Sequence, residues 1–142
     1  MNLPPAFWDS SALIPLCADQ PQTSSAKALY NCYSIVVWWA TEVEIVSGLT
    51  RLERMGGIDN AQFLVGKGLM QSLQRIWTPV HESPAIASKA CALLEKFPLR
   101  AADALQLAAA LQWCEGQPNG NVFLTFDRRL REAAGLAGFT LE

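Results

Sequence analysis

The stretch "NVFLTFDRRLREAAG", residues 121–135, passes from an apolar run into a basic segment at a single acidic residue, Asp127. The apolar part is short and rich in branched and aromatic side chains, which predicts a buried strand. Leu130 and Ala133 recur at a spacing of three in the part that follows, so a helix is predicted to begin at Asp127. An Asp at this position caps a helix and stabilises it by about 1 kcal/mol. Local structure is therefore a sufficient explanation of Asp127 taken alone.

The same change from strand to helix recurs along the rest of the chain. Strands are also predicted at 6–9, 34–39 and 75–80, and a last one at 138–142. Helices are predicted after the first strand and at 25–33, from 41 to the Gly56-Gly57 stop, and at 60–73, 84–97 and 99–116. This alternation predicts an α/β fold: a three-layer α/β/α sandwich with a mostly parallel central sheet and right-handed crossovers.

Several helix starts carry local signals. Thr41 and Glu44 fit the Thr-x-x-Glu pattern of a capping box. Ser83 is followed by Pro84, a common residue at the first position of a helix. These signals place the predicted helices directly behind the predicted strands.

Composition indicates one domain, residues 1–142, because a chain of 142 residues that is 51% hydrophobic can bury one core and shows no sharp change along its length. No apolar stretch approaches the roughly 20 residues of a membrane span, and the start lacks a secretory signal, which together predict a cytoplasmic protein. Cys17, Cys32, Cys91 and Cys114 are scattered and His81 is the only histidine, so a zinc site is not expected. The cysteines are predicted to be small buried hydrophobes.

The charge pattern excludes a globally basic surface. Eleven basic residues stand against thirteen acidic ones, for a net charge of −2, so any contact with nucleic acid must be local. Two modest basic clusters occur, and each alone is interpreted as a solvated helix face. They comprise Arg51 and Arg54, and Arg128, Arg129 and Arg131.

Four acidic residues occupy comparable places. Asp9, Glu44 and Asp127 each follow a predicted strand, and Asp103 lies in the first turn of the Ala-rich helix. Sites in open α/β sheets form beyond the carboxyl ends of the strands, so the topology can bring all four together. Each acid also has a local explanation as a cap or as a partner of the helix dipole.

Converging carboxylates need a proton or a cation. At ~4 Å and an effective dielectric constant near 20, each pair of charges repels by about 4 kcal/mol. Oxygen ligands without His or Cys favour a hard metal ion, Mg²⁺ or Mn²⁺. Such a site suits hydrolysis of a phosphodiester bond.

The motifs that hold these acids are "FWDSSALIPL", "ATEVEIVSGL", "LRAADALQLAAAL" and "VFLTFDRRLREAAGLAGF". In this order they resemble the four acidic motifs of PIN domains, most closely those of VapC-type toxins of bacterial toxin–antitoxin pairs. The resemblance covers nearly the whole chain. It implies a Mg²⁺- or Mn²⁺-dependent ribonuclease in which Asp9, Glu44, Asp103 and Asp127 are the catalytic and metal-binding acids.

The resemblance also implies supporting residues and partners. Ser11 fits the small polar position after the first Asp, and Thr125 matches a hydroxyl residue that orients an acid. Arg128 and Arg129, with Arg131 beside them, become candidate contacts for RNA phosphates. A small antitoxin protein and a second copy of the chain, forming a homodimer, are the expected protein partners.

The chain departs from the family pattern at two positions. Gln106 stands where many members have His, and Leu130 stands where some have a further acid. A phosphatase of the haloacid dehalogenase type is disfavoured, because the Asp-x-Asp that it needs is replaced by Asp9-Ser10-Ser11. The alternative that stays open is a PIN-like module that binds RNA or protein without cleaving.

Overall fold

The computed structural model describes residues 2–142, and within them four parallel strands form one sheet in the order β3–β2–β1–β4. The strands are β1 Pro5–Trp8, β2 Ser34–Trp38, β3 Thr78–Val80 and β4 Val122–Leu124. In the register of the sheet, Ala6 lies opposite Ile35 of β2 on one side and Val122 of β4 on the other. The two central strands are thus those that precede Asp9 and Glu44.

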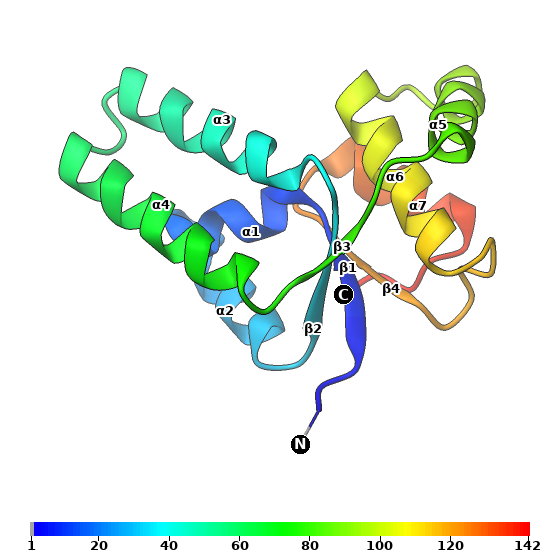
Figure 1. The fold of residues 1–142 in the computed structure, drawn as a ribbon, viewed down its shortest axis with the longest axis horizontal. Helices are drawn as coiled ribbons and strands as arrows, with labels where there is room; N and C mark the ends of the chain where they lie inside the picture. Colours follow the sequence, from blue (N-terminus) through cyan, green and yellow to red (C-terminus); the bar gives the residue numbers. More distant parts are fainter. Residues whose placement is uncertain (1) are drawn as a thin grey trace.

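Helices cover both faces of the sheet, as Figure 1 shows. One layer holds α1 Ser10–Cys17, α2 Thr23–Tyr30, α3 Thr41–Arg54 and α4 Asn60–Gln74. The other layer holds α5 Pro84–Lys96, α6 Ala101–Trp113 and α7 Arg128–Ala137. The predicted three-layer α/β/α sandwich with a parallel sheet is confirmed.

The side chains of each strand alternate between two hydrophobic cores, one on each face of the sheet, because successive residues of a strand point to opposite faces. Phe7 is fully buried and packs with the side chains of α5, α6 and α7. Its neighbours Ala6 and Trp8 are also fully buried but pack with α1, α3 and α4. The sheet is covered on both faces, which explains why β1 and β2 are almost continuously apolar.

Three helix starts have the caps that their sequences predict. Asp9, Ser83 and Asp127 are the N-cap residues of α1, α5 and α7, and the side chain of each accepts a backbone N–H bond from the first turn. Two of these caps, Asp9 and Asp127, are also candidate site residues. Capping therefore fixes their backbone position at the carboxyl edge of the sheet.

Other local predictions are wrong. The N-cap of α3 is Ala40, Thr41 is the first helical residue, and no side chain caps the helix, so the capping box of Thr41 and Glu44 does not form. A capping box is present instead at the start of α4, between Asp59 and Gln62. The side chain of Thr41 is buried and bonds to α6, which removes it from the local cap.

Two further expectations are corrected. The segment 138–142 forms a single isolated bridge, between Val122 and Thr140, and not a strand. Cys32 and Cys91 are exposed, so only Cys17 fits the predicted buried class, with Cys114 at intermediate exposure. No helix within residues 2–142 is long and apolar enough to cross a membrane.

Candidate functional site

The four predicted acids line one pocket at the carboxyl edge of the sheet, with a volume of about 740 Å³. Asp9 follows β1 and Asp127 follows β4, while Glu44 and Asp103 lie in the first turns of α3 and α6. Because β1 lies between β2 and β4, the ends of these strands bring acids that are far apart in sequence to one place.

Asp9 is the buried acid of the pocket, with 3% of its surface exposed. Its Oδ2 accepts hydrogen bonds from the hydroxyls of Ser11 at 2.6 Å and Thr125 at 2.8 Å. Each hydroxyl also accepts a backbone N–H, from Phe126 and Asp127 respectively. Since a hydroxyl has one hydrogen, these contacts direct both hydrogens to Asp9. Burial raises the pKa of Asp9, and the hydrogen bonds oppose that shift.

Glu44 is held at both carboxylate oxygens. Ser10 Oγ lies 3.0 Å from Glu44 Oε1 and 3.4 Å from Asp9 Oδ1, so one hydroxyl links the two acids. Gln106 Nε2 donates to Glu44 Oε2 at 3.1 Å and to Thr41 Oγ1 at 3.2 Å. Gln106 is fully buried and its Oε1 has no hydrogen-bond partner. The amide hydrogens are therefore used to hold Glu44, at the cost of an unpaired carbonyl oxygen.

Asp103 and Asp127 are more open. Asp127 is exposed, and its Oδ1 accepts the backbone N–H of Leu130 at 2.9 Å as the cap of α7. Asp103 is half-buried at the start of α6. Neither carboxylate accepts a bond from a hydroxyl or amide side chain among the hydrogen bonds found in residues 2–142.

The acids influence one another electrostatically. Burial, followed by repulsion from Asp9, raises the pKa of Glu44 to about 7. Burial and repulsion from Asp127 and Asp9 raise the pKa of Asp103, and the backbone and guanidinium of Arg100 oppose that shift. The pocket thus concentrates negative charge that a proton or a cation would relieve.

The donor set fits a hard divalent cation. In the described part of the chain, no three acidic, His or Cys side chains converge closely enough to surround one ion by themselves. Mg²⁺ does not require this, because it is held by one or two carboxylates, keeps several waters and completes its shell with substrate phosphates. Asp9 and Glu44 would hold such an ion. Both residues line the pocket, and a cation would relieve the repulsion between their two negative charges.

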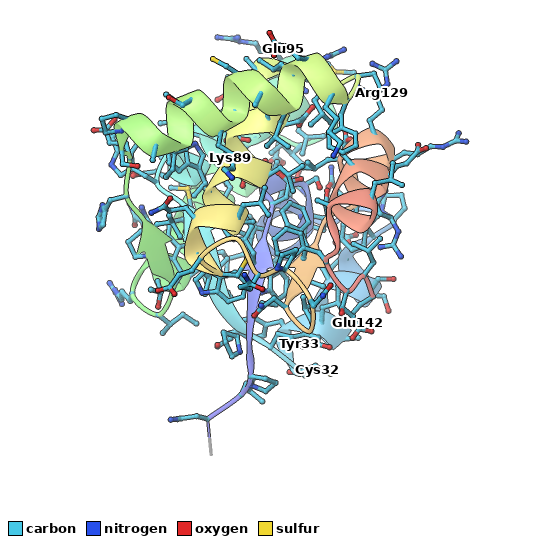
Figure 2. All side chains as sticks on the ribbon, turned by 90° about the vertical axis from the view of Figure 1, so that its right-hand side faces the viewer. Cys32, Tyr33, Lys89, Glu95, Arg129 and Glu142 are labelled. Atoms are coloured by element: carbon cyan, nitrogen blue, oxygen red, sulfur yellow. The ribbon has the colours of Figure 1, made fainter. Side chains whose placement is uncertain are left out.

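Basic residues surround the acids. Guanidinium groups from three different segments line the same pocket, and their charge suits the phosphates of a nucleic acid. They are Arg51 in α3, Arg100 before α6, and Arg128 and Arg129 in α7. Figure 2 shows Arg129 at the start of α7, at the opposite end of the molecule from Tyr33 and Glu142.

Three other titratable residues, one of them a predicted phosphate contact, lie outside the pocket. Arg131 Nη1 donates to the backbone carbonyl of Glu142 at 2.8 Å and is not a lining residue, so its predicted phosphate contact is not supported. His81 is exposed, outside the pocket, as expected for a surface residue. Glu42 is also exposed outside it, whereas its neighbour Glu44 faces in.

Sequence reasoning did not assign Ser10, Gln106, Arg51 or Arg100 to the site. Ser10 follows Asp9 directly, but nothing local shows that its hydroxyl reaches Glu44. Gln106 differs from the family pattern, and its bond to Glu44 spans 62 residues. Arg51 could have been found, because it lies seven residues after Glu44 and so on the same face of a helix.

Comparisons with known proteins agree with this architecture. A family model described as "PIN domain" matches residues 6–136. A toxin–antitoxin complex from Klebsiella pneumoniae is 18% identical over 86% of this chain and 86% of its own, with a TM-score of 0.59. VapC20 of Mycobacterium tuberculosis, described as a toxin that cleaves the sarcin–ricin loop, is 18% identical over 95% of this chain and 96% of its own, with a TM-score of 0.65.

A third solved structure extends the likeness. PAE2754 of Pyrobaculum aerophilum is 17% identical over 97% of this chain and 89% of its own, with a TM-score of 0.67. Among curated protein sequences, none matches the chain. At these identities the solved structures establish the fold, and the family match covers the segment from β1 to α7 in which all four acids lie.

Proposed function

Because the chain belongs to the PIN domain family, we propose that it is a Mg²⁺- or Mn²⁺-dependent endoribonuclease that hydrolyses RNA phosphodiester bonds, as the toxin of a toxin–antitoxin pair. The observation that carries the proposal is the pocket in which Asp9, Glu44, Asp103 and Asp127 meet. The raised pKa values of Glu44 and Asp103 support it, because burial and then repulsion from neighbouring acids disfavour their negative charges, and a cation would favour them.

Asp9 and Glu44 are the residues to which we assign cation binding. Asp9 is fixed by Ser11 and Thr125 with its Oδ2 fully engaged, which leaves Oδ1 to face a cation. Burial and repulsion from Asp9 raise the pKa of Glu44 to about 7, so this carboxyl group holds a proton more readily than an ordinary glutamate does. A cation bound there would compete with that proton. A bound divalent cation would neutralise the scissile phosphate and activate an attacking water.

The other polar groups of the pocket bind and orient substrate. Asp103 and Asp127 add two further carboxylates to the lining of the pocket. Arg128 and Arg129 stand at the start of α7, next to Asp127, where they can contact RNA phosphates. RNA of single-stranded or looped form suits such an open pocket better than a duplex does.

The proposed protein partners are an antitoxin and a second copy of the chain. Support comes from the toxin–antitoxin complex found among the similar structures. It also comes from apolar side chains on the outer face of α4, where Leu64 and Val65 are 58% and 62% exposed. Such exposure is typical of a surface that another protein covers. Sedimentation of the purified chain, alone and after coexpression with any small protein that a neighbouring reading frame encodes, tests both partners.

The direct test is cleavage of a mixed RNA substrate with Mg²⁺, with Mn²⁺ and with EDTA. Wild-type protein should cut with either metal and stop in EDTA. Absence of cleavage by folded protein, free of any copurified inhibitor, would favour the alternative of a PIN-like module that binds RNA or protein without cleaving.

A further inference from the structure

We propose that a side groove next to the acidic pocket binds the base of a nucleotide flanking the cleaved bond, and so gives the enzyme a base preference. The proposal rests on the nuclease function proposed above. The groove has a volume of about 340 Å³, at the lower end of the range for small-molecule sites. It lies between α1, α3, the turn before α2 and the segment after β4.

The groove is continuous with the acidic pocket. Ser11, Arg51 and Asp127 line both cavities. An RNA chain with its scissile phosphate at the four acidic residues can therefore place the neighbouring nucleotide in the groove. Arg51 stands seven residues after Glu44 on the same face of α3, which is about 10 Å along the helix axis. Because Arg51 lines both cavities, its guanidinium is within reach of an RNA phosphate bound where they meet.

The polar wall of the groove carries two amide side chains, Gln20 and Gln22. A primary amide both donates and accepts, which suits the edge of a base. Gln22 is the N-cap residue of α2, yet its side chain makes no capping bond, so its amide is available. The turn that presents both is rigid, because Thr23 Oγ1 accepts from the Gln20 backbone at 2.9 Å and donates to the Pro15 carbonyl at 2.7 Å.

The apolar wall suits the face of a base. Phe126 is half-buried, and its backbone N–H donates to Ser11 Oγ at 2.9 Å, which fixes its position. Ile14 and Leu52 complete this wall. Gly48 lies against Ile14 in this wall, where a Cβ would lie 2.5 Å from Ile14 Cδ1 and shift the end of that side chain. An aromatic ring, aliphatic side chains and two amides together match a planar heterocycle with a polar edge.

The first experiment compares cleavage of a randomised RNA pool, with Mn²⁺, by wild type, by the double variant Gln20→Ala/Gln22→Ala and by the control Gln71→Ala. Gln71 is an exposed glutamine on α4, outside both cavities. Wild type and control should show the same base preference at one position beside the cut. The double variant should lose it by about tenfold while still cutting. An unchanged preference in the double variant would overturn the groove assignment and leave the nuclease function intact.

A second experiment tests the groove even if no RNA is cut, an outcome that would overturn the proposed function instead. Each of the four ribonucleoside monophosphates is titrated in EDTA, and the side-chain amide NMR signals of Gln20 and Gln22 are followed. The single variants Gln20→Ala and Gln22→Ala assign these signals. At least one nucleotide should shift both signals saturably at millimolar concentration, and Arg51→Ala should weaken that binding. Signals that stay unmoved by all four nucleotides would contradict the proposal.

Discussion

The four acids of the pocket form two pairs with different surroundings. The inner pair, Asp9 and Glu44, is held by three hydroxyls and one amide, and Asp9 is almost completely buried. The outer pair, Asp103 and Asp127, stands at two helix starts and is half-buried or exposed. The fold therefore fixes two of the carboxylates before any ligand arrives and leaves the other two able to adjust.

This difference explains why no three acids in residues 2–142 already surround a point where an ion would sit. In the function proposed above, the inner pair would provide two carboxylates for Mg²⁺, and waters or phosphates would occupy the rest of its shell. Burial and then repulsion from Asp127 and Asp9 raise the pKa of Asp103, and a cation or substrate would relieve that repulsion. We therefore expect substitutions in the inner pair to have the larger effects.

The largest effect is expected from Asp9→Asn. Asparagine keeps the N-cap of α1 and accepts from Ser11 and Thr125, but it lacks the charge that holds a cation. Loss of several kcal/mol of metal-assisted stabilisation corresponds to a fall in kcat/KM on the order of 1,000-fold or more. RNA cleavage kinetics measure it, with the exposed Asp19→Asn as the matched control. A variant as active as this control would remove the inner pair from the mechanism.

A smaller loss, on the order of 100-fold in kcat/KM, is expected from Asp127→Asn. The asparagine side chain would still accept the Leu130 N–H as the cap of α7, so the thermal midpoint should stay unchanged. The same cleavage assay at several Mn²⁺ concentrations measures the loss, part of which excess metal should restore. A loss equal to that of Asp9→Asn would break the distinction between the two pairs.

A loss of about tenfold in apparent metal affinity is expected from Gln106→Leu. The leucine removes the donor to Glu44 Oε2, and it also removes the buried carbonyl oxygen that has no partner. Stability should therefore change by less than about 1 kcal/mol, measured by urea unfolding. Mn²⁺ titration of cleavage, with the exposed Gln112→Leu as control, separates the two effects. Unchanged metal dependence would mean that Gln106 does not position Glu44.

The same contrast shows what sequence can predict. Caps are local, so Asp9, Ser83 and Asp127 could be assigned from their own neighbours, and the strand–helix alternation was enough for the sandwich. The role of Thr41 was predicted wrongly, because its hydroxyl meets Gln106, 65 residues away, and not its own helix start. Ser10 bonds to Glu44 across 34 residues for the same reason. Contacts of this length depend on how α1, α3 and α6 meet around the sheet, which no local pattern contains.

A pH dependence of stability without metal tests the environment of Glu44 independently of cleavage. The pKa of Glu44 is raised to about 7 by burial and by Asp9, so the folded state binds its proton more tightly than the unfolded state does. The stabilisation from this proton is full below the ordinary pKa of about 4.5 and is lost as pH rises through 7. Urea unfolding in EDTA should show a fall between pH 5 and pH 8 that is smaller in Glu44→Gln. An identical fall in both proteins would contradict the assignment.

The most direct test of the central claim is Mn²⁺ binding, followed by the loss of the free-ion EPR signal as protein is added. Wild-type protein and Asp19→Asn should take up Mn²⁺ saturably, Asp127→Asn should bind it more weakly, and Asp9→Asn should bind none above the background of buffer without protein. Equal uptake by wild type and Asp9→Asn would contradict a cation site built on the inner carboxylates.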